Sequence, residues 1–162
     1  MKKIWFLLLL FLLLPSSTFA FVLGLKSTDN TVENIVKIEK DYNLYLPLVG
    51  FIYDPRERQD VIQELGKMNQ QLWNKRIYHI SVSPNHFSAQ EVAAGAFDEQ
   101  YKLFFQMIKR LKLKVIFRTM HEMNGGWYPR GSSPENFKKA WIHVWELSRS
   151  LGLDQKDILF DF

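Results

Sequence analysis

From residue 21 onward, short apolar runs alternate with longer segments in which apolar residues recur at helical spacing. This alternation constrains the fold more than any other feature, because strands joined by helices pair side by side in parallel. Ser88 with Glu91 caps a short turn, and Ser133 before Pro134 marks a helix start. The expected strands cover 21–25, 45–53, 77–82, 114–120 and 157–162, and the expected helices cover 31–40, 56–74, 97–111 and 134–151.

Repeated strand–helix units that end on a final strand leave two architectures open. A closed barrel of such units takes about 250 residues, more than the 162 residues of this chain. The chain is therefore either the first half, about strands 1–5, of a barrel of the TIM type, or a complete five-stranded, doubly wound sheet. In both cases we expect an α/β fold of parallel (β/α) repeats.

Residues 1–20 have the pattern of a secretory signal peptide. Lys2 and Lys3 supply the positive start, an unbroken apolar run of 11 residues follows over 4–14, and Ala20 closes a small-residue cleavage site. That run is shorter than the about 20 residues that a membrane-spanning helix needs. We expect cleavage after Ala20 and a secreted or periplasmic protein with no stable membrane span. An uncleaved N-terminal anchor is the alternative.

The composition excludes several kinds of site. The chain has no cysteine, so it has no disulfide and no thiolate ligand for a metal. Its formal net charge of +4 falls to +2 once Lys2 and Lys3 are removed, and both signs are scattered along the chain. A nucleic-acid partner is therefore not expected, because such proteins concentrate basic residues on one surface.

The segment that carries most of the candidate chemistry follows the fourth expected strand. Ligands of barrels and of open parallel sheets bind at the carboxyl ends of the strands, which is where His121 and Glu122 fall. Strand alternation predicts that Arg118, Met120 and Glu122 share one side of the strand, opposite Thr119 and His121.

The loop after Glu122 combines glycines with aromatic side chains. Gly125 and Gly126 are expected to let the chain turn sharply, since glycine adopts backbone conformations that other residues resist. Trp127 and Tyr128 offer flat apolar faces that suit the C–H faces of sugar rings. Gly125 also stands where a zinc protease helix of the His-Glu-x-x-His type requires its second histidine, so no metal and no other cofactor is expected.

Three segments resemble glycoside hydrolase family 26, whose best-known members are secreted β-mannanases. The first, Arg118-x-x-His121-Glu122-Met123-Asn124-Gly125-x-Trp127-Tyr128-Pro129, is similar to the family's signature at strand four. The others are Gly95-x-x-Asp98, similar to the entry into the third helix, and Ala140-Trp141-x-His143-Val144, similar to a stretch of the fourth helix. They stand in the family's order and spacing between residues 91 and 147.

This resemblance implies a fold, an activity and residue roles. Family members are (β/α) eight-fold barrels that hydrolyse a β-linked glycan with retention, so residues 21–162 would form the amino-terminal half of such a barrel. Glu122 would be the general acid/base, and a β-linked polysaccharide of the mannan class would be the substrate. The implied substrate-binding residues are Arg118, His121, Asn124, Trp127 and Tyr128, to which the position of the loop after the third expected strand adds His86.

Two departures from the family's pattern bear on the implied activity. Arg130 stands where the family often has tryptophan, which weakens the aromatic floor of the cleft. The family's nucleophile is a glutamate at the end of strand seven, beyond the last expected strand here, and retaining hydrolysis needs two carboxyl groups about 5–5.5 Å apart. We therefore expect the 162-residue chain to be inactive alone and to need the carboxyl-terminal half of the barrel.

Two further functional readings remain open at this point. One is a non-catalytic or vestigial carbohydrate-binding domain, and the other is a complete small open-sheet protein with an unrelated role. If the short chain does hydrolyse glycans, Asp54 or Asp161 at neighbouring strand ends would supply the second carboxylate, although Asp54 before Pro55 is also a residue that favours turns. His79 and His143 are expected to be buried histidines with hydrogen-bond partners.

Overall fold

The computed structural model describes residues 23–26, 31–54, 66–67, 76–83, 86–129 and 133–162. The expected signal peptide and nearly all of the expected helix 56–74 lie outside these ranges, so those two predictions are not tested. Within the described ranges, no helix combines the length and the apolar character that a bilayer crossing requires.

Five parallel strands form one sheet, in the order in which they occur along the chain. Each strand pairs with the next, so every crossover leads to the neighbouring position. The predicted α/β fold of parallel (β/α) repeats is confirmed. The strands are β1 (Gly24–Lys26), β2 (Leu48–Tyr53), β3 (Ile77–Val82), β4 (Lys114–Thr119) and β5 (Ile158–Asp161).

Three of the described helices begin at a residue whose side chain accepts one of the first free N–H groups. Ser88 and Glu91 form the predicted capping box, and the Ser133 side chain accepts the N–H of Asn136 at the predicted helix start. The first helix is capped by Thr31, whose side chain accepts the N–H of Asn34. The helices are α2 (Val32–Tyr42), α4 (Ala89–Ala93), α5 (Asp98–Leu111) and α6 (Pro134–Ser150).

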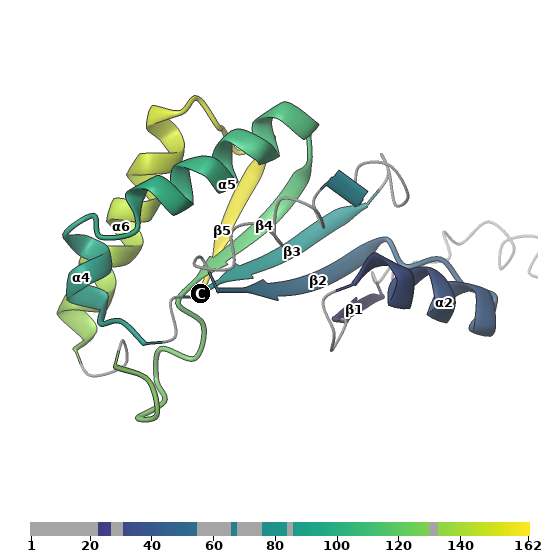
Figure 1. Ribbon diagram of the computed structural model, residues 1–162, viewed down its shortest axis with the longest axis horizontal. Helices are drawn as coiled ribbons and strands as arrows, with labels where there is room; N and C mark the ends of the chain where they lie inside the picture. The colour runs from purple at the N-terminus through teal and green to yellow at the C-terminus, as the bar shows by residue number, and fades with distance from the viewer. Residues whose placement is uncertain (1–22, 27–30, 55–65, 68–75, 84–85, 130–132) are drawn as a thin grey trace, which may run out of the picture.

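The order of the strands decides between the two architectures. A doubly wound sheet reverses its strand order at a switch point and carries helices on both faces, whereas a barrel keeps its strands in sequence with the helices outside. Here the order is sequential, and α4, α5 and α6 lie together on one side of the sheet (Figure 1). The five strands are thus arranged as in the first part of a TIM-type barrel.

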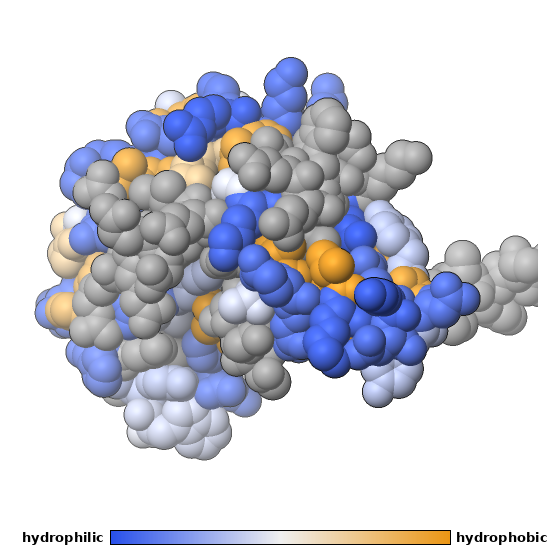
Figure 2. Space-filling view, turned by 45° about the vertical axis from the view of Figure 1, so that its right-hand side comes forward, coloured by the Kyte–Doolittle hydropathy of each residue, from blue (hydrophilic) through white to orange (hydrophobic). Residues whose placement is uncertain are grey.

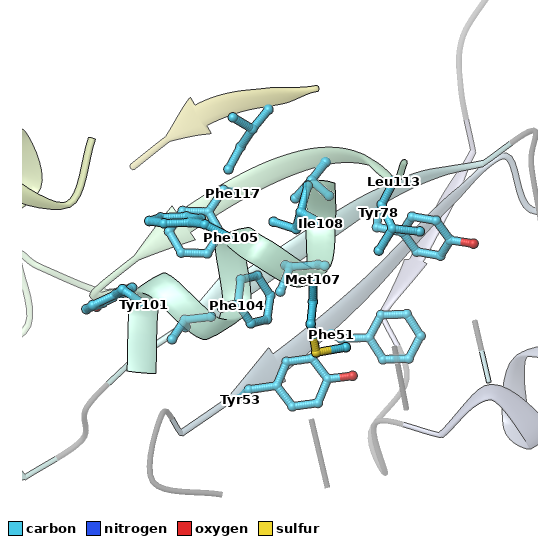
Figure 3. Close-up of a cluster of buried hydrophobic side chains, with 14 of the residues drawn as sticks. Phe51, Tyr53, Tyr78, Tyr101, Phe104, Phe105, Met107, Ile108, Leu113 and Phe117 are labelled. Carbon is cyan, nitrogen blue, oxygen red and sulfur yellow. The ribbon is translucent and has the colours of Figure 1, made fainter. Parts of the chain in front are cut away.

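An aromatic core joins α5 to the sheet. Phe117 of β4 is fully buried, and its ring centroid lies 5.2 Å from that of Phe105 and 5.3 Å from that of Phe160. Large aromatic side chains dominate the energetics of such a core because each buries about 150–250 Å². The buried side chains of α5 are Tyr101, Phe104, Phe105, Met107 and Ile108 (Figure 3).

The opposite face of the sheet is less covered by the described residues. Ile77 and Leu159, which point to this face, are 41% and 52% exposed. In a barrel this face lines the interior, which side chains from all the strands fill. On the side of the molecule drawn in Figure 2, hydrophobic areas of the surface are separated by hydrophilic side chains.

Candidate functional site

The backbone changes conformation where β4 ends. Met120 and Glu122 have φ angles of 52° and 56°, in the left-handed region that costs a non-glycine residue about 1–2 kcal/mol and that clusters at functional sites. Met120 is buried and Glu122 is exposed. The prediction that Arg118, Met120 and Glu122 share one side is therefore wrong, because strand alternation stops at Thr119.

The carboxylate of Glu122 is paired with the indole of Trp127. Nε1 of Trp127 donates a hydrogen bond to Oε2 of Glu122 over 2.8 Å. Both side chains are exposed, and 70% of the Trp127 surface is accessible. The backbone N–H of Gly125 donates to the carbonyl of Glu122 over 3.0 Å, which closes the turn between them. An aromatic face and a carboxyl group thus lie side by side at the carboxyl end of a strand.

Gly125 makes room for this indole. A Cβ atom placed on Gly125 would lie 2.3 Å from the Trp127 ring, whereas one placed on Gly126 would meet nothing within 4 Å. Neither glycine has a positive φ. The expectation that the two residues are needed for an unusual backbone conformation is therefore wrong: the structure requires glycine at 125 for close approach of the ring.

His121 is held by two serines from the neighbouring strand. Oγ of Ser83 lies 2.6 Å from Nδ1 of His121 and accepts the backbone N–H of the same histidine over 3.1 Å. Oγ of Ser81 lies 3.3 Å from Nδ1. The ring of Tyr128 meets that of His121 edge to face, with centroids 5.6 Å apart.

Neither serine was singled out from the sequence. The alternation of the Ser81-Val82-Ser83 run placed both on one side of their strand. Only the pairing of β3 with β4 showed that His121 lies beside them.

Arg118 points to the inner face of the sheet, where it meets Asp161 of β5. Nη2 of Arg118 and Nε2 of His79 lie 2.5 Å and 3.1 Å from Oδ2 of Asp161, and the N–H of Phe162 donates to Oδ1. Burial opposes ionisation, but the hydrogen bonds from His79 and Arg118 and the charge of Arg118 outweigh it, so the pKa of Asp161 lies below its usual value. Both Arg118 and His79 are thus bound to a carboxylate that the sequence did not assign to them.

The other expected site residues are more dispersed. Asn124 and His86 are exposed, and the described contacts include no hydrogen bond from either to Glu122 or Trp127. Asp54 is buried at the end of β2. Arg130, which departs from the family's pattern, lies outside the described residues.

Two of the segments that resembled the family are joined by a hydrogen bond. Nε2 of His143 in α6 lies 2.6 Å from Oδ1 of Asp98, the first residue of α5. Gly95 precedes this helix with a φ of 85°, and a Cβ placed on it would lie 3.3 Å from the Asp98 carboxyl carbon. His143 has a hydrogen-bond partner, as expected, but it is only partly buried; the bond ties α6 to the start of α5.

The side chains at the β4 end can position a substrate and exchange a proton, since a carboxyl, an imidazole and an exposed indole meet there. Metal chemistry would need a cluster of ligands. Among the described residues, no three or more histidine or acidic side chains are grouped closely enough to bind a metal ion.

Comparison with known proteins supports the fold. No protein-family model matches the sequence, and no curated protein matches it. The structure is similar to the crystal structure of the Podospora anserina GH26-CBM35 β-(1,4)-mannanase, with a TM-score of 0.64 and 14% sequence identity. The likeness covers 85% of this chain and 38% of that chain. At this identity it shows a glycoside hydrolase-like fold, and the present chain spans well under half of the neighbour's length.

Proposed function

We propose that this chain is part of an exported glycan-cleaving barrel that acts on β-linked polysaccharides of the mannan class, with Glu122 as the general acid/base. One observation carries the proposal: an exposed carboxylate and an exposed indole are hydrogen-bonded at the carboxyl end of a barrel strand. That end of the barrel is where enzymes of this fold bind their substrates. The fold neighbour is itself a mannanase, which supports the same substrate class.

The geometry of the pair suits a sugar chain. A pyranose ring stacked on the open face of Trp127 would lie within reach of Glu122, because the indole edge is only 2.8 Å from the carboxylate. The apolar face of a sugar packs on an aromatic ring, while its hydroxyl groups and glycosidic oxygen remain available at the edge. Glu122 would then protonate the leaving oxygen, and in the second step of a retaining reaction it would activate water.

A retaining mechanism also needs a nucleophilic carboxylate about 5–5.5 Å from the acid/base. Asp161 does not suit this role, because its carboxylate is already bound by Arg118, His79 and the N–H of Phe162. We assign the nucleophile to a strand beyond the five described here, which would belong to the carboxyl-terminal half of the barrel. In that arrangement the Arg118–Asp161 pair contributes to the floor of the site.

The proposed sugar contacts of the remaining site residues follow from where these residues lie in the structure. His121 precedes Glu122 and meets Tyr128 edge to face, so these two rings would line the cleft beside the acid/base. Asn124 and His86 are exposed in loops near this end of the sheet and would contact more distant sugar units.

A second candidate function is carbohydrate binding without cleavage. The exposure of Trp127 favours it, because a stacking platform needs no second carboxylate. The two candidates share the platform and differ in turnover, so they are separated by assaying binding and cleavage on the same protein.

The proposal is tested by titrating the 162-residue chain with mannohexaose and following tryptophan fluorescence. Trp127→Ala should weaken binding by up to about 10-fold, since an aromatic contact contributes about 0.5–1.5 kcal/mol beyond buried area. Trp145→Ala is the matched control, because Trp145 is also exposed but stacks on Arg149 in α6. Equal affinity of wild type and Trp127→Ala, or no binding at all, would reject the platform and with it both candidate functions.

A further inference from the structure

Ser83 directly follows the last residue of β3 and contacts the candidate site. Its side chain is fully buried, and its backbone N–H donates to the carbonyl of Tyr53 over 2.9 Å, continuing the ladder between β2 and β3. Its hydroxyl reaches across to the chain after β4, where it meets both the backbone and the ring of His121. Ser83 is thus held rigidly on one side and touches a candidate site residue on the other.

The hydrogen bonds that the Ser83 hydroxyl can form restrict which nitrogen of the His121 ring carries a proton. A serine hydroxyl has one proton and two lone pairs. One lone pair of Ser83 accepts the His121 backbone N–H. Among the described residues, the one acceptor within reach of the Ser83 proton is Nδ1 of His121, 2.6 Å away.

Ser81 adds a second hydroxyl to the same nitrogen. It is 2% exposed, and its Oγ lies 3.3 Å from Nδ1. If Nδ1 carried a proton, the protons of both buried hydroxyls would lack an acceptor among the described residues, and buried polar groups are rarely left in that state. If Nδ1 is unprotonated, it accepts from Ser83 at short range and Ser81 approaches as a weaker second donor.

We propose that Ser83 is a positioning residue that holds the neutral imidazole of His121 in its Nε2–H form. In this form the ring can only donate at Nε2, and that a sugar hydroxyl accepts this hydrogen bond rests on the proposed function. Through the backbone N–H of His121, the same hydroxyl also fixes the residue that precedes Glu122 and its left-handed backbone.

The tautomer is measured directly by long-range ¹H–¹⁵N correlation spectra of the imidazole rings in the full 162-residue chain. The chain has only 4 histidines, so the ring signals are few, and His121→Gln identifies the set that belongs to His121. At about pH 8, above the ordinary histidine pKa of about 6.5, His121 should show an unprotonated Nδ1 and a protonated Nε2. A protonated Nδ1 in the wild-type chain would overturn the proposal without any variant.

Variants then assign the effect to Ser83. Ser83→Ala should convert the single tautomer into a mixture, and Ser83→Cys, which keeps a similar shape but donates weakly, should shift the ratio in the same direction. Ser81→Ala removes an identical group 3.3 Å from the ring and should leave the Nε2–H form dominant. An unchanged tautomer in Ser83→Cys, or an equal change in Ser81→Ala, would contradict the assignment to Ser83.

Adding mannohexaose to the same sample separates this inference from the proposed function. If both are right, the Nε2 signal of His121 shifts in the wild-type chain while Nδ1 remains unprotonated. If the sugar leaves the His121 signals unmoved, the proposed sugar contact is wrong, and the tautomer spectra still decide the role of Ser83.

Discussion

The indole N–H of Trp127 donates a hydrogen bond to the carboxylate of Glu122 over 2.8 Å. Because the ring also lies against the backbone of Gly125, the position of the aromatic platform and that of the carboxylate are coupled. A change that moves the ring therefore also removes the hydrogen bond from the indole that orients Glu122. This coupling can be tested without altering either residue.

Gly125→Ala should displace Trp127. The added methyl group would meet the indole at 2.3 Å, well inside van der Waals contact, and the ring is the part that can swing away. Mannohexaose affinity should fall by up to about 10-fold, as for loss of the aromatic contact itself, and the Trp127 indole N–H resonance should move toward that of a solvated indole.

Gly126→Ala is the matched control for this change. The same methyl group is added one residue later, where nothing lies within 4 Å. Affinity and the Trp127 resonance should stay as in the wild-type chain. Similar effects of the two substitutions would show that backbone freedom, and not space for the ring, is what position 125 requires.

Stability should depend on an ion pair at the other end of the sheet. Arg76 binds both carboxylate oxygens of Glu39, at 2.5 and 3.0 Å, with side chains only 8% and 15% exposed. Arg76→Met should lower the free energy of unfolding by more than about 1 kcal/mol, because it leaves a part-buried carboxylate without its guanidinium partner. Lys37→Met, which breaks the exposed Lys37–Asp41 pair, should change the unfolding free energy far less in the same urea titration. Equal losses would contradict the burial of the Glu39–Arg76 pair.

The same carboxylate should make stability depend on pH. Burial opposes ionisation of Glu39, but the hydrogen bonds from Arg76 and from the N–H of Leu46, together with the charge of Arg76, lower its pKa below 4.5. The stabilisation is therefore complete above the unfolded pKa and is lost as the pH falls through the lower folded value. Urea midpoints of the wild type should fall more steeply with acid than those of Glu39→Gln; parallel curves would contradict the shift.

The sequence predicted strands and helix starts correctly where residue patterns within the segment itself determine them. The alternating periods located β3 at 77–82, and the hydroxyl and proline signals located the starts of α4 and α6. It failed at Met120 and Glu122, since a left-handed backbone in these residues is imposed by surrounding contacts and leaves no local signal.

The sequence predicted where along the chain the candidate site lies, but it did not predict the partners of the site residues. The motif places His121, Glu122 and Trp127 after the fourth strand, and β4 ends just before them at Thr119, while their roles stay predictions. The partners Ser83 and Asp161 depend on the register of β3 with β4 and of β4 with β5, which no residue pattern within one strand specifies.

Export remains a prediction, and it is checked at the amino terminus. Signal peptidase should remove residues 1–20, so Edman sequencing of the protein recovered outside the cytoplasm should begin at Phe21. A protein that retains Met1 and stays with the membrane would support the uncleaved anchor instead.

The 162-residue chain should release no reducing sugar from soluble mannan, because the nucleophile that retaining cleavage requires is assigned to a later strand. Asp161 is bound by Arg118 and His79 and is not expected to replace it. Sustained release by this chain that Glu122→Gln abolishes would contradict the assignment and make Asp54 or Asp161 the second carboxylate.

The central claim is that Glu122 is the acid/base of a glycan-cleaving barrel, and one assay tests it most directly. Reducing-sugar release from soluble mannan is measured for the chain extended by the in-frame sequence after codon 162, beside its Glu122→Gln variant. General acid–base catalysis contributes about 10²–10⁴-fold, so the extended protein should cleave mannan and the variant should lose activity by that factor. Cleavage that survives Glu122→Gln, an extended protein without activity, or a gene with no such extension would contradict the account.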